Sequence, residues 1–219
     1  MARFDFRRTP RPGDARIALA EATRQIIGEV TSSADSSPAF ERARDLVEQA
    51  LAQLRDGEHG RSYSSAEASV AGRAAEQEPG AFLDYSPIVG PLNPLAAPLD
   101  VVRHDDGTII GTGRFGGAYE GPPGCVHGGF IAAGFDEMCG FAMGESGLVG
   151  MTVRLEISYR SPTPLHEEVR FIARLDRVEG RKIYTTSTLH HGDRLCAEAT
   201  GLFVSMDPAM FVHLKQTRA

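Results

Sequence analysis

The residues best suited to chemistry lie in the segment GPPGCVHGGFIAAGFDE at positions 121–137, where a histidine and two glycines precede two carboxylates. A Gly-Gly pair at the start of a helix leaves backbone N–H groups that a ligand can approach closely. The first helical turn has no internal partners for these groups and carries the positive end of the helix dipole. Gly128 and Gly129 are therefore candidates for stabilising a developing oxyanion, although glycines can also serve only to allow a tight turn.

A histidine and two carboxylates flank this turn. Three roles are open for His127: a general base, a group that positions the substrate or the turn, or a polar residue that is satisfied at a helix N-terminus. Asp136 and Glu137 lie in a segment whose other members are largely apolar. A carboxylate on so apolar a helix costs free energy unless it is paired, exposed or functional, so both are candidates for a role in chemistry.

The spacing of these residues has a consequence for assembly. Gly129 and Asp136 are seven positions apart, so on a helix they share one stripe but lie about 10 Å apart along the axis. One substrate carbonyl cannot touch both. Two such helices running antiparallel across a twofold axis would bring Gly129 of one subunit opposite Asp136 of the other. The spacing therefore predicts a dimer with two composite sites.

The elements that must hold this segment are one helix and several strands. FIAAGFDEMCGFAM has the spacing of a buried helix, and LDVVRHDDGTIIGTGRF at 99–115 contains a strong hairpin signal at Asp106-Gly107. Four further β-runs follow the helix, and we interpret them as consecutive hairpins, hence as an antiparallel sheet. A helix that is apolar on most sides must be covered, so the sheet has to wrap around it. The predicted class is α+β.

Alternation along the β-runs predicts which side chains are buried. In MTVRLEISYRSP at 151–162, Val153, Leu155, Ile157 and Tyr159 alternate with Thr152, Arg154 and other polar residues, which predicts a half-buried strand. In EEVRFIARLDRV at 167–178, the apolar members of the same pattern are Val169, Phe171, Ala173 and Leu175.

The N-terminal third predicts a separate helical region. DARIALAEATRQIIGEV at 14–30 and the amphipathic segment from Pro38 to Gly57 predict two helices whose apolar faces need a main domain or a partner to cover. Residues 61–81 are small and polar and predict a flexible linker. We therefore expect a helical extension at 1–60, this linker, a main domain at 82–210 and a C-terminal tail at 211–219.

Composition excludes several classes of protein. The formal net charge of −6 over 219 residues gives no basic surface for nucleic acid, and no apolar run is long enough to span a bilayer. Cys125, Cys139 and Cys196 are odd in number and far apart, which argues against a disulfide framework and a structural zinc site. With no apolar signal segment near Met1, these features predict a cytoplasmic protein without a metal.

The motif GPPGCVHGGFIAAGFDE, the strand MTVRLEISYRSPTPL and the hairpins after it resemble the hotdog-fold acyl-CoA thioesterases, most closely the phenylacetyl-CoA thioesterase-like branch. The resemblance covers residues 85–207. It implies a hotdog fold, an antiparallel β-sheet wrapped around a central helix, and hydrolysis of acyl-CoA to free acid and coenzyme A without a cofactor.

The resemblance also implies roles for individual residues. Asp136 would be the nucleophile or general base, and Glu137, one position further along the helix, would point about 100° away. Thr152 matches the strand threonine that holds the carboxylate or the water. His127 would position the substrate or the turn, and the N–H of Gly129, with Gly128 beside it, would polarise the thioester carbonyl.

Arginines near the strand ends suit the phosphates of coenzyme A, and we name Arg160 as a candidate for substrate binding. The expected assembly is a homodimer, and two dimers can pair into a homotetramer. The alternative function is a non-catalytic hotdog protein that binds acyl-CoA or a lipid as a sensor, because a fold alone does not fix an activity.

Overall fold

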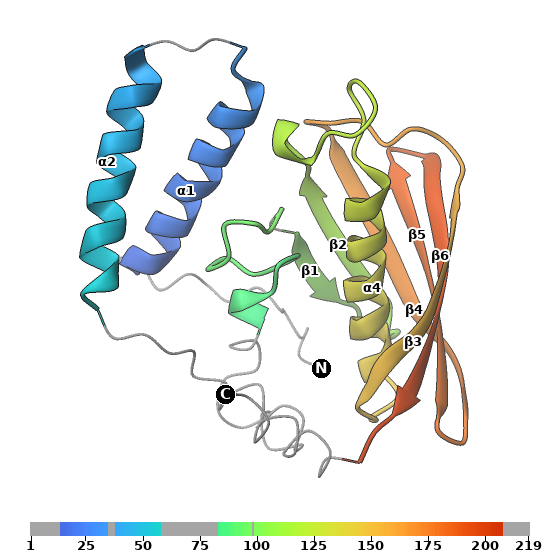
Figure 1. The fold of residues 1–219 in the computed structure, drawn as a ribbon. Helices are drawn as coiled ribbons and strands as arrows, with labels where there is room; N and C mark the ends of the chain where they lie inside the picture. Colours follow the sequence, from blue (N-terminus) through green and yellow to red (C-terminus); the bar gives the residue numbers. More distant parts are fainter. Residues whose placement is uncertain (1–13, 35–37, 58–82, 98, 208–219) are drawn as a thin grey trace.

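The computed structural model describes residues 14–34, 38–57, 83–97 and 99–207. A six-stranded antiparallel sheet curves around the apolar helix α4 (Gly128–Gly144), as predicted (Figure 1). The sheet has the order β1-β2-β4-β5-β6-β3. Its strands are β1 (Asp100–Arg103), β2 (Ile109–Arg114), β3 (Gly150–Tyr159), β4 (Glu168–Glu179), β5 (Lys182–His191) and β6 (Arg194–Ser205).

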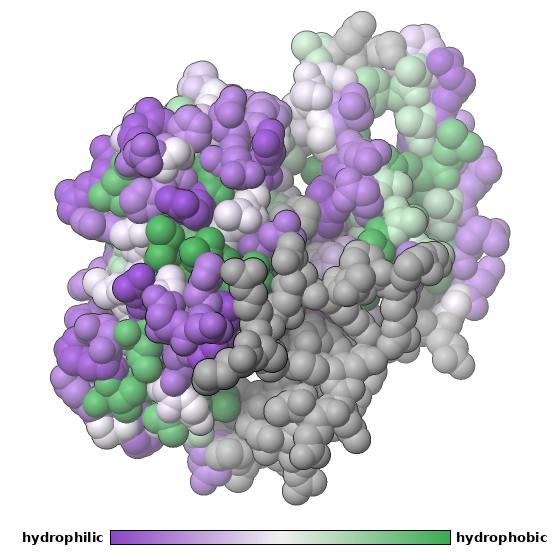
Figure 2. Space-filling view, turned by 180° about the vertical axis from the view of Figure 1, so that it is seen from behind, coloured by the Kyte–Doolittle hydropathy of each residue, from purple (hydrophilic) through white to green (hydrophobic). Residues whose placement is uncertain are grey.

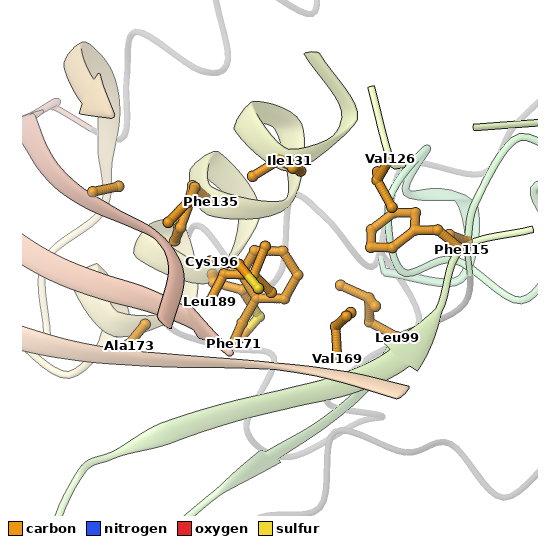
Figure 3. Packing of buried hydrophobic residues seen from close by; sticks show 14 of the residues in the cluster. Leu99, Phe115, Val126, Ile131, Phe135, Val169, Phe171, Ala173, Leu189 and Cys196 are labelled. Atoms are coloured by element: carbon orange, nitrogen blue, oxygen red, sulfur yellow. The ribbon is translucent and has the colours of Figure 1, made fainter. Parts of the chain in front are cut away.

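The core forms where α4 packs on the concave face of the sheet. Phe135 of α4 meets Phe171 of β4 edge to face, with ring centroids 5.2 Å apart and both side chains fully buried (Figure 3). Gly134 permits this close approach, because a Cβ atom there would lie 2.7 Å from the ring of Phe171. Val169, Phe171 and Ala173 are all fully buried, which confirms the alternation predicted for this strand.

The strand order corrects one expectation. The first of the four β-runs does not form a hairpin with the second, because β3 pairs with β6 at the edge of the sheet and β4 pairs with β2. The connecting residues 160–167 instead bond to the segment that precedes α4. The carbonyl of Thr163 accepts from Val126 N–H (2.9 Å), and Leu165 N–H donates to the carbonyl of Gly124 (3.1 Å). The chain is thus carried past the start of α4 instead of turning back on itself.

The other hairpins follow the prediction. β1 and β2 are joined at Asp106-Gly107, where Gly107 has a positive φ of 79°. The turns from β4 to β5 and from β5 to β6 each contain a glycine with φ of 58°, Gly180 and Gly192. Such backbone angles are reached by glycine at little cost, so these positions fix where the sheet turns.

Two helices precede the sheet, α1 (Ala15–Ser32) and α2 (Pro38–Arg55). The side chain of Asp14 caps α1 by accepting from Arg16 N–H (3.0 Å). α1 lies on the side of this pair that faces the sheet domain, and α2 on the far side (Figure 1). The predicted linker at 61–81 and tail at 211–219 lie outside the described residues, and the domain boundaries stay predictions.

The two helices differ in how much they bury. Ala20 of α1 is buried, and the guanidinium of Arg24 donates to the carbonyls of Ala96 (2.8 Å) and Asn93 (3.2 Å). No residue of α2 is buried within the described parts of the chain. Hydrophobic residues accordingly lie among hydrophilic ones on the surface seen from behind (Figure 2).

Short 3-10 helices shape the segments before α4: η1 (Leu83–Tyr85) and η2 (Gly117–Tyr119). The hydroxyl of Tyr119 donates to the carbonyl of Leu95 (3.0 Å), which ties η2 to the proline-rich segment 83–97. The segment 83–97 and η2 lie between α1 and α4, so they connect the helical extension to the start of the central helix.

Candidate active site

His127 is the N-cap of α4. Its Nδ1 accepts from the N–H of Gly129 (3.0 Å), its carbonyl accepts from Phe130 N–H (3.0 Å), and its own N–H donates to the carbonyl of Tyr119 (2.8 Å). Of the three roles left open for this residue, capping the helix is the one that these contacts describe. The same contact gives the Gly129 N–H a partner within its own chain.

Gly128 is held by a residue that the sequence did not single out for the site. The hydroxyl of Tyr159, at the end of β3, donates to the carbonyl of Gly128 (2.8 Å). A Cβ atom on Gly128 would lie 3.2 Å from that hydroxyl oxygen, so a larger residue would push the tyrosine away. In the described part of the chain, the Gly128 N–H has no hydrogen-bond partner, as expected in the first turn of a helix.

Asp136 and Thr152 meet, as the resemblance implies. The Thr152 hydroxyl donates to Asp136 Oδ1 at 2.8 Å, and both residues are exposed in this single chain. The two come from different elements, α4 and β3, sixteen residues apart. One carboxylate oxygen is therefore oriented by the strand.

A β-bulge explains how Thr152 reaches the helix. Strict alternation places Thr152 on the opposite face from Leu155 and Ile157, yet all three side chains lie on the helix side. The pairing of β3 with β6 shifts between Thr152 and Arg154, so Val153 is the extra residue. A bulge inserts one residue and re-aims the neighbouring side chains. The predicted period of two is thus wrong at this point, and Val153, which was predicted to be buried, is 58% exposed. Tyr159, at the end of the strand, was also predicted to be buried and is 55% exposed.

Glu137 faces away from Asp136 and takes part in a different network. Its Oε1 accepts from the hydroxyl of Ser86 (2.7 Å), and the Ser86 oxygen in turn accepts from the N–H groups of Ile88 (3.1 Å) and Val89 (3.2 Å). Burial raises the pKa of Glu137; the Ser86 hydrogen bond opposes that rise and the neighbouring Asp136 adds to it. No sequence signal links Ser86 to Glu137, because they are 51 residues apart.

Arg160 is engaged away from the start of the helix. Its guanidinium pairs with Glu198 of the neighbouring strand β6, with Nε 3.0 Å from the carboxylate, and both side chains are exposed. The structure brings it into no hydrogen bond with Gly128 or Gly129 among the described residues. Its role in binding coenzyme A stays a prediction.

A cavity of about 640 Å3 adjoins the first turn of α4. Gly129, Phe130 and Ala133 form its wall on α4, and Arg24, Ile27 and Gly28 form its wall on α1. The segments 87–97 and 114–119 and His127 form further parts of its wall, and the cavity is partly open to solvent. A volume of this size is typical of small-molecule sites.

Within the ranges that the structure describes, no group of three or more histidine, cysteine, aspartate and glutamate side chains is arranged to hold a metal ion. In the same ranges, no helix combines the length and apolarity needed to traverse a bilayer. All three cysteines are unpaired, and Cys139 and Cys196 are buried in the core.

Comparison with known families decides what kind of domain this is. Residues 123–199, which contain the α4 turn, Asp136 and Thr152, match the family model of the thioesterase superfamily. Over these residues the chain is similar to the thioesterase superfamily. The crystal structure of a protein of that superfamily aligns with 88% of this chain and 96% of its own, at 28% identity and a TM-score of 0.75. The predicted hotdog fold and the predicted resemblance to this superfamily are therefore confirmed.

Named relatives cover a shorter stretch. Acyl-coenzyme A thioesterase THEM4 of Rattus norvegicus is 40% identical over 91 residues, which are 41% of this chain and 39% of the relative. Acyl-coenzyme A thioesterase THEM5 of Homo sapiens is 35% identical over 96 residues, 41% of this chain and 38% of the relative. The chain thus spans about two fifths of the length of these relatives.

Proposed function

We propose that this protein is an acyl-CoA thioesterase, which uses water to convert an acyl-CoA into a free acid and coenzyme A. The observation that carries the proposal is the Thr152–Asp136 hydrogen bond of 2.8 Å beside the glycine turn, in a thioesterase superfamily domain. The relatives THEM4 and THEM5 are named as acyl-coenzyme A thioesterases, which supports coenzyme A as the thiol.

The proposed chemistry assigns one task to each group. The first turn of α4 polarises the thioester carbonyl through a backbone N–H, because charge develops on that oxygen as the tetrahedral intermediate forms. The Gly128 N–H has no partner among the described residues and can donate to the thioester carbonyl oxygen. The Gly129 N–H donates to the same oxygen once that oxygen shares or displaces its bond to His127. His127 keeps the turn in shape.

Asp136 supplies the attack. With Oδ1 held by Thr152, Oδ2 is oriented toward the reacting centre, where it either removes a proton from water or attacks the carbonyl carbon itself. In the first route, water adds to the carbonyl carbon and the C–S bond breaks. In the second, an acyl anhydride with Asp136 forms and water hydrolyses it. Both routes end with a proton on the departing coenzyme A sulfur.

The site is completed by a second copy of the chain. Gly129 and Asp136 lie about 10 Å apart along α4, too far to act on one carbonyl. Asp136 and Thr152 are exposed in the single chain, and the adjacent edge strand β3 also exposes Met151 and Val153. A homodimer that pairs these surfaces would bring Gly129 of one subunit to Asp136 of the other. A homotetramer of two such dimers and a cytoplasmic location stay part of the proposal.

Thiol release from acetyl-, butyryl-, octanoyl-, dodecanoyl- and phenylacetyl-CoA tests the activity. The proposal expects the wild-type protein to release coenzyme A from at least one of these esters at a rate proportional to enzyme concentration. If the protein binds them in a calorimetric titration but releases no thiol, it is the non-catalytic acyl-CoA binder and the proposed activity is wrong.

A further inference from the structure

The cavity beside the first turn of α4 has one wall on α4 and another on α1, which lie about 100 residues apart in sequence. On α4, Gly129 and Ala133 are four positions apart and share one face, so the cavity begins at the turn assigned to the thioester carbonyl. On the opposite side, Ile27 and Gly28 of α1 close it. A group bound at Gly129 therefore has the cavity next to it and α1 at the far wall.

The chemistry of the walls suits an apolar group. The side chains that line the cavity are mainly hydrophobic, including Ile27, Ile88, Leu95, Ala118, Tyr119 and Phe130, and its polar lining consists of Arg24, Arg114 and His127. The Tyr119 hydroxyl is already bonded to the carbonyl of Leu95, and Phe130 packs on the ring of Tyr119 at a centroid distance of 4.9 Å. Phe130 and Leu95 are 39% and 63% exposed, so an apolar ligand would remove their surface from water.

α1 is anchored in this position. Arg24 lines the cavity, but its guanidinium donates to the carbonyls of Ala96 and Asn93 and pairs with Glu21, so its charge is already engaged. The buried Ala20 lies one turn earlier on the same helix. Hydrogen bonds from a charged donor are stronger than neutral ones, so α1 forms a defined wall and not a loose cover.

The α1 wall of the cavity has unfilled space at Gly28. A Cβ atom built on Gly28 meets no atom within 4 Å, and the residue lies in the middle of a helix, where glycine costs about 1 kcal/mol relative to alanine. The small size of this residue leaves unfilled space in the cavity beside α1.

We propose that this cavity holds the acyl group of the substrate and that α1 sets acyl specificity, with Gly28 admitting long chains. This inference rests on the proposed function, which gives the position of the thioester carbonyl. It assigns the N-terminal helix α1 a role in substrate selection.

Two variants test the proposal by adding side-chain volume on α1, one at a residue that lines the cavity and one at an exposed residue that does not. In Gly28→Leu, the added side chain fills the cavity, whereas Ala22→Leu adds the same side chain at an exposed position of the same helix that does not line it. We expect Gly28→Leu to lower the ratio of kcat/KM for dodecanoyl-CoA to that for acetyl-CoA by about tenfold or more, since overpacking a site costs 1–3 kcal/mol. Ala22→Leu should leave this ratio within about twofold. An unchanged ratio in Gly28→Leu, with helical content retained by circular dichroism, would overturn the proposal.

A binding measurement separates this inference from the proposed activity. If the wild type releases no thiol from any ester, the activity is wrong, and the cavity is then tested by calorimetric titration with dodecanoyl-CoA and acetyl-CoA. The inference expects Gly28→Leu to weaken the Kd for dodecanoyl-CoA by about tenfold relative to that for acetyl-CoA. Equal weakening of both ligands, no weakening, or no wild-type binding of dodecanoyl-CoA would contradict it.

Discussion

Thr152 orients Asp136 through one hydrogen bond that a β-bulge makes possible. The extra residue Val153 lets Thr152 face the helix, and the hydroxyl meets Asp136 Oδ1 at 2.8 Å. A carboxylate on an exposed helix surface would otherwise rotate among several orientations. The bond thus selects one orientation of the Asp136 carboxylate, the proposed attacking group, before the substrate binds.

Thr152→Val tests that role, because valine keeps the shape of the side chain and removes the hydroxyl. A hydrogen bond to a charged group contributes about 1.5–3 kcal/mol, less at an exposed site, so we expect kcat to fall about tenfold. Thr152→Ser, which retains the hydroxyl, should recover most of the wild-type kcat. Steady-state thiol release measures both variants, and equal activity of Thr152→Val and wild type would show that the bond plays no part in turnover.

At the residue scale, sequence motifs predicted the contacts between near neighbours and missed those made over long separations. The HGG motif placed His127 at the start of the helix, and the resemblance brought Thr152 to Asp136. The bonds from Ser86 to Glu137 and from Tyr159 to Gly128 were not predicted. Each joins residues more than 30 positions apart through common side-chain types, and only the folded chain determines such pairs.

At the element scale, Glu137 joins the central helix to the segment that lines the cavity. Ser86 bonds to Glu137 and also accepts from the N–H groups of Ile88 and Val89, so one carboxylate fixes the backbone next to Pro87 and Ile88 of the cavity wall. Asp136 and Glu137, adjacent in sequence, therefore take part in contacts on different sides of α4.

The raised pKa of Glu137 predicts a pH-dependent effect of Glu137→Gln. Burial favours the protonated form in the folded chain, so the contribution of Glu137 to stability is complete below its unfolded pKa of about 4.3 and is lost as pH rises through the folded pKa. Glutamine stays neutral and still accepts from Ser86. We expect a higher melting temperature than wild type at pH 7 and no difference near pH 4, measured by thermal denaturation. A variant less stable than wild type at pH 7 would contradict this account.

The elements themselves were predictable to different degrees. The apolar α4 and the glycine turns at Gly107, Gly180 and Gly192 are local signals, and the structure contains them where the sequence indicates. The position of β3 is not a local property, because it depends on residues 160–167 pairing with the segment before α4. Strand order therefore could not be predicted from alternation alone.

At the scale of the whole molecule, the proposed composite site requires a second copy of the chain. Asp136 and Thr152 lie on the open side of the single chain, next to the edge strand β3 with its exposed Val153. A second subunit placed there would exclude water from the site, which strengthens the electrostatic interactions within it.

Val153→Arg tests whether the activity depends on the formation of the dimer. A charge placed in an apolar interface is costly, so we expect the variant to sediment as a single 23.6 kDa chain, while the wild type sediments at twice that mass as a dimer or at four times that mass as a tetramer. Its kcat/KM should fall by about tenfold or more together with the dimer fraction. Val178→Arg, at a similarly exposed apolar position on β4, is the matched control and should remain dimeric. A monomeric Val153→Arg with full activity would exclude the composite site.

The central claim is that Asp136 performs the attack, and the most direct measurement is kcat for thiol release by Asp136→Asn. Asparagine has nearly the same shape but is neither a base nor a nucleophile of comparable strength, so we predict a fall of roughly two to four orders of magnitude with the dimer and melting temperature retained. Asp193→Asn, in the exposed turn between β5 and β6, is the control and should keep wild-type kcat. An Asp136→Asn protein that is folded, dimeric and as active as wild type would contradict the account.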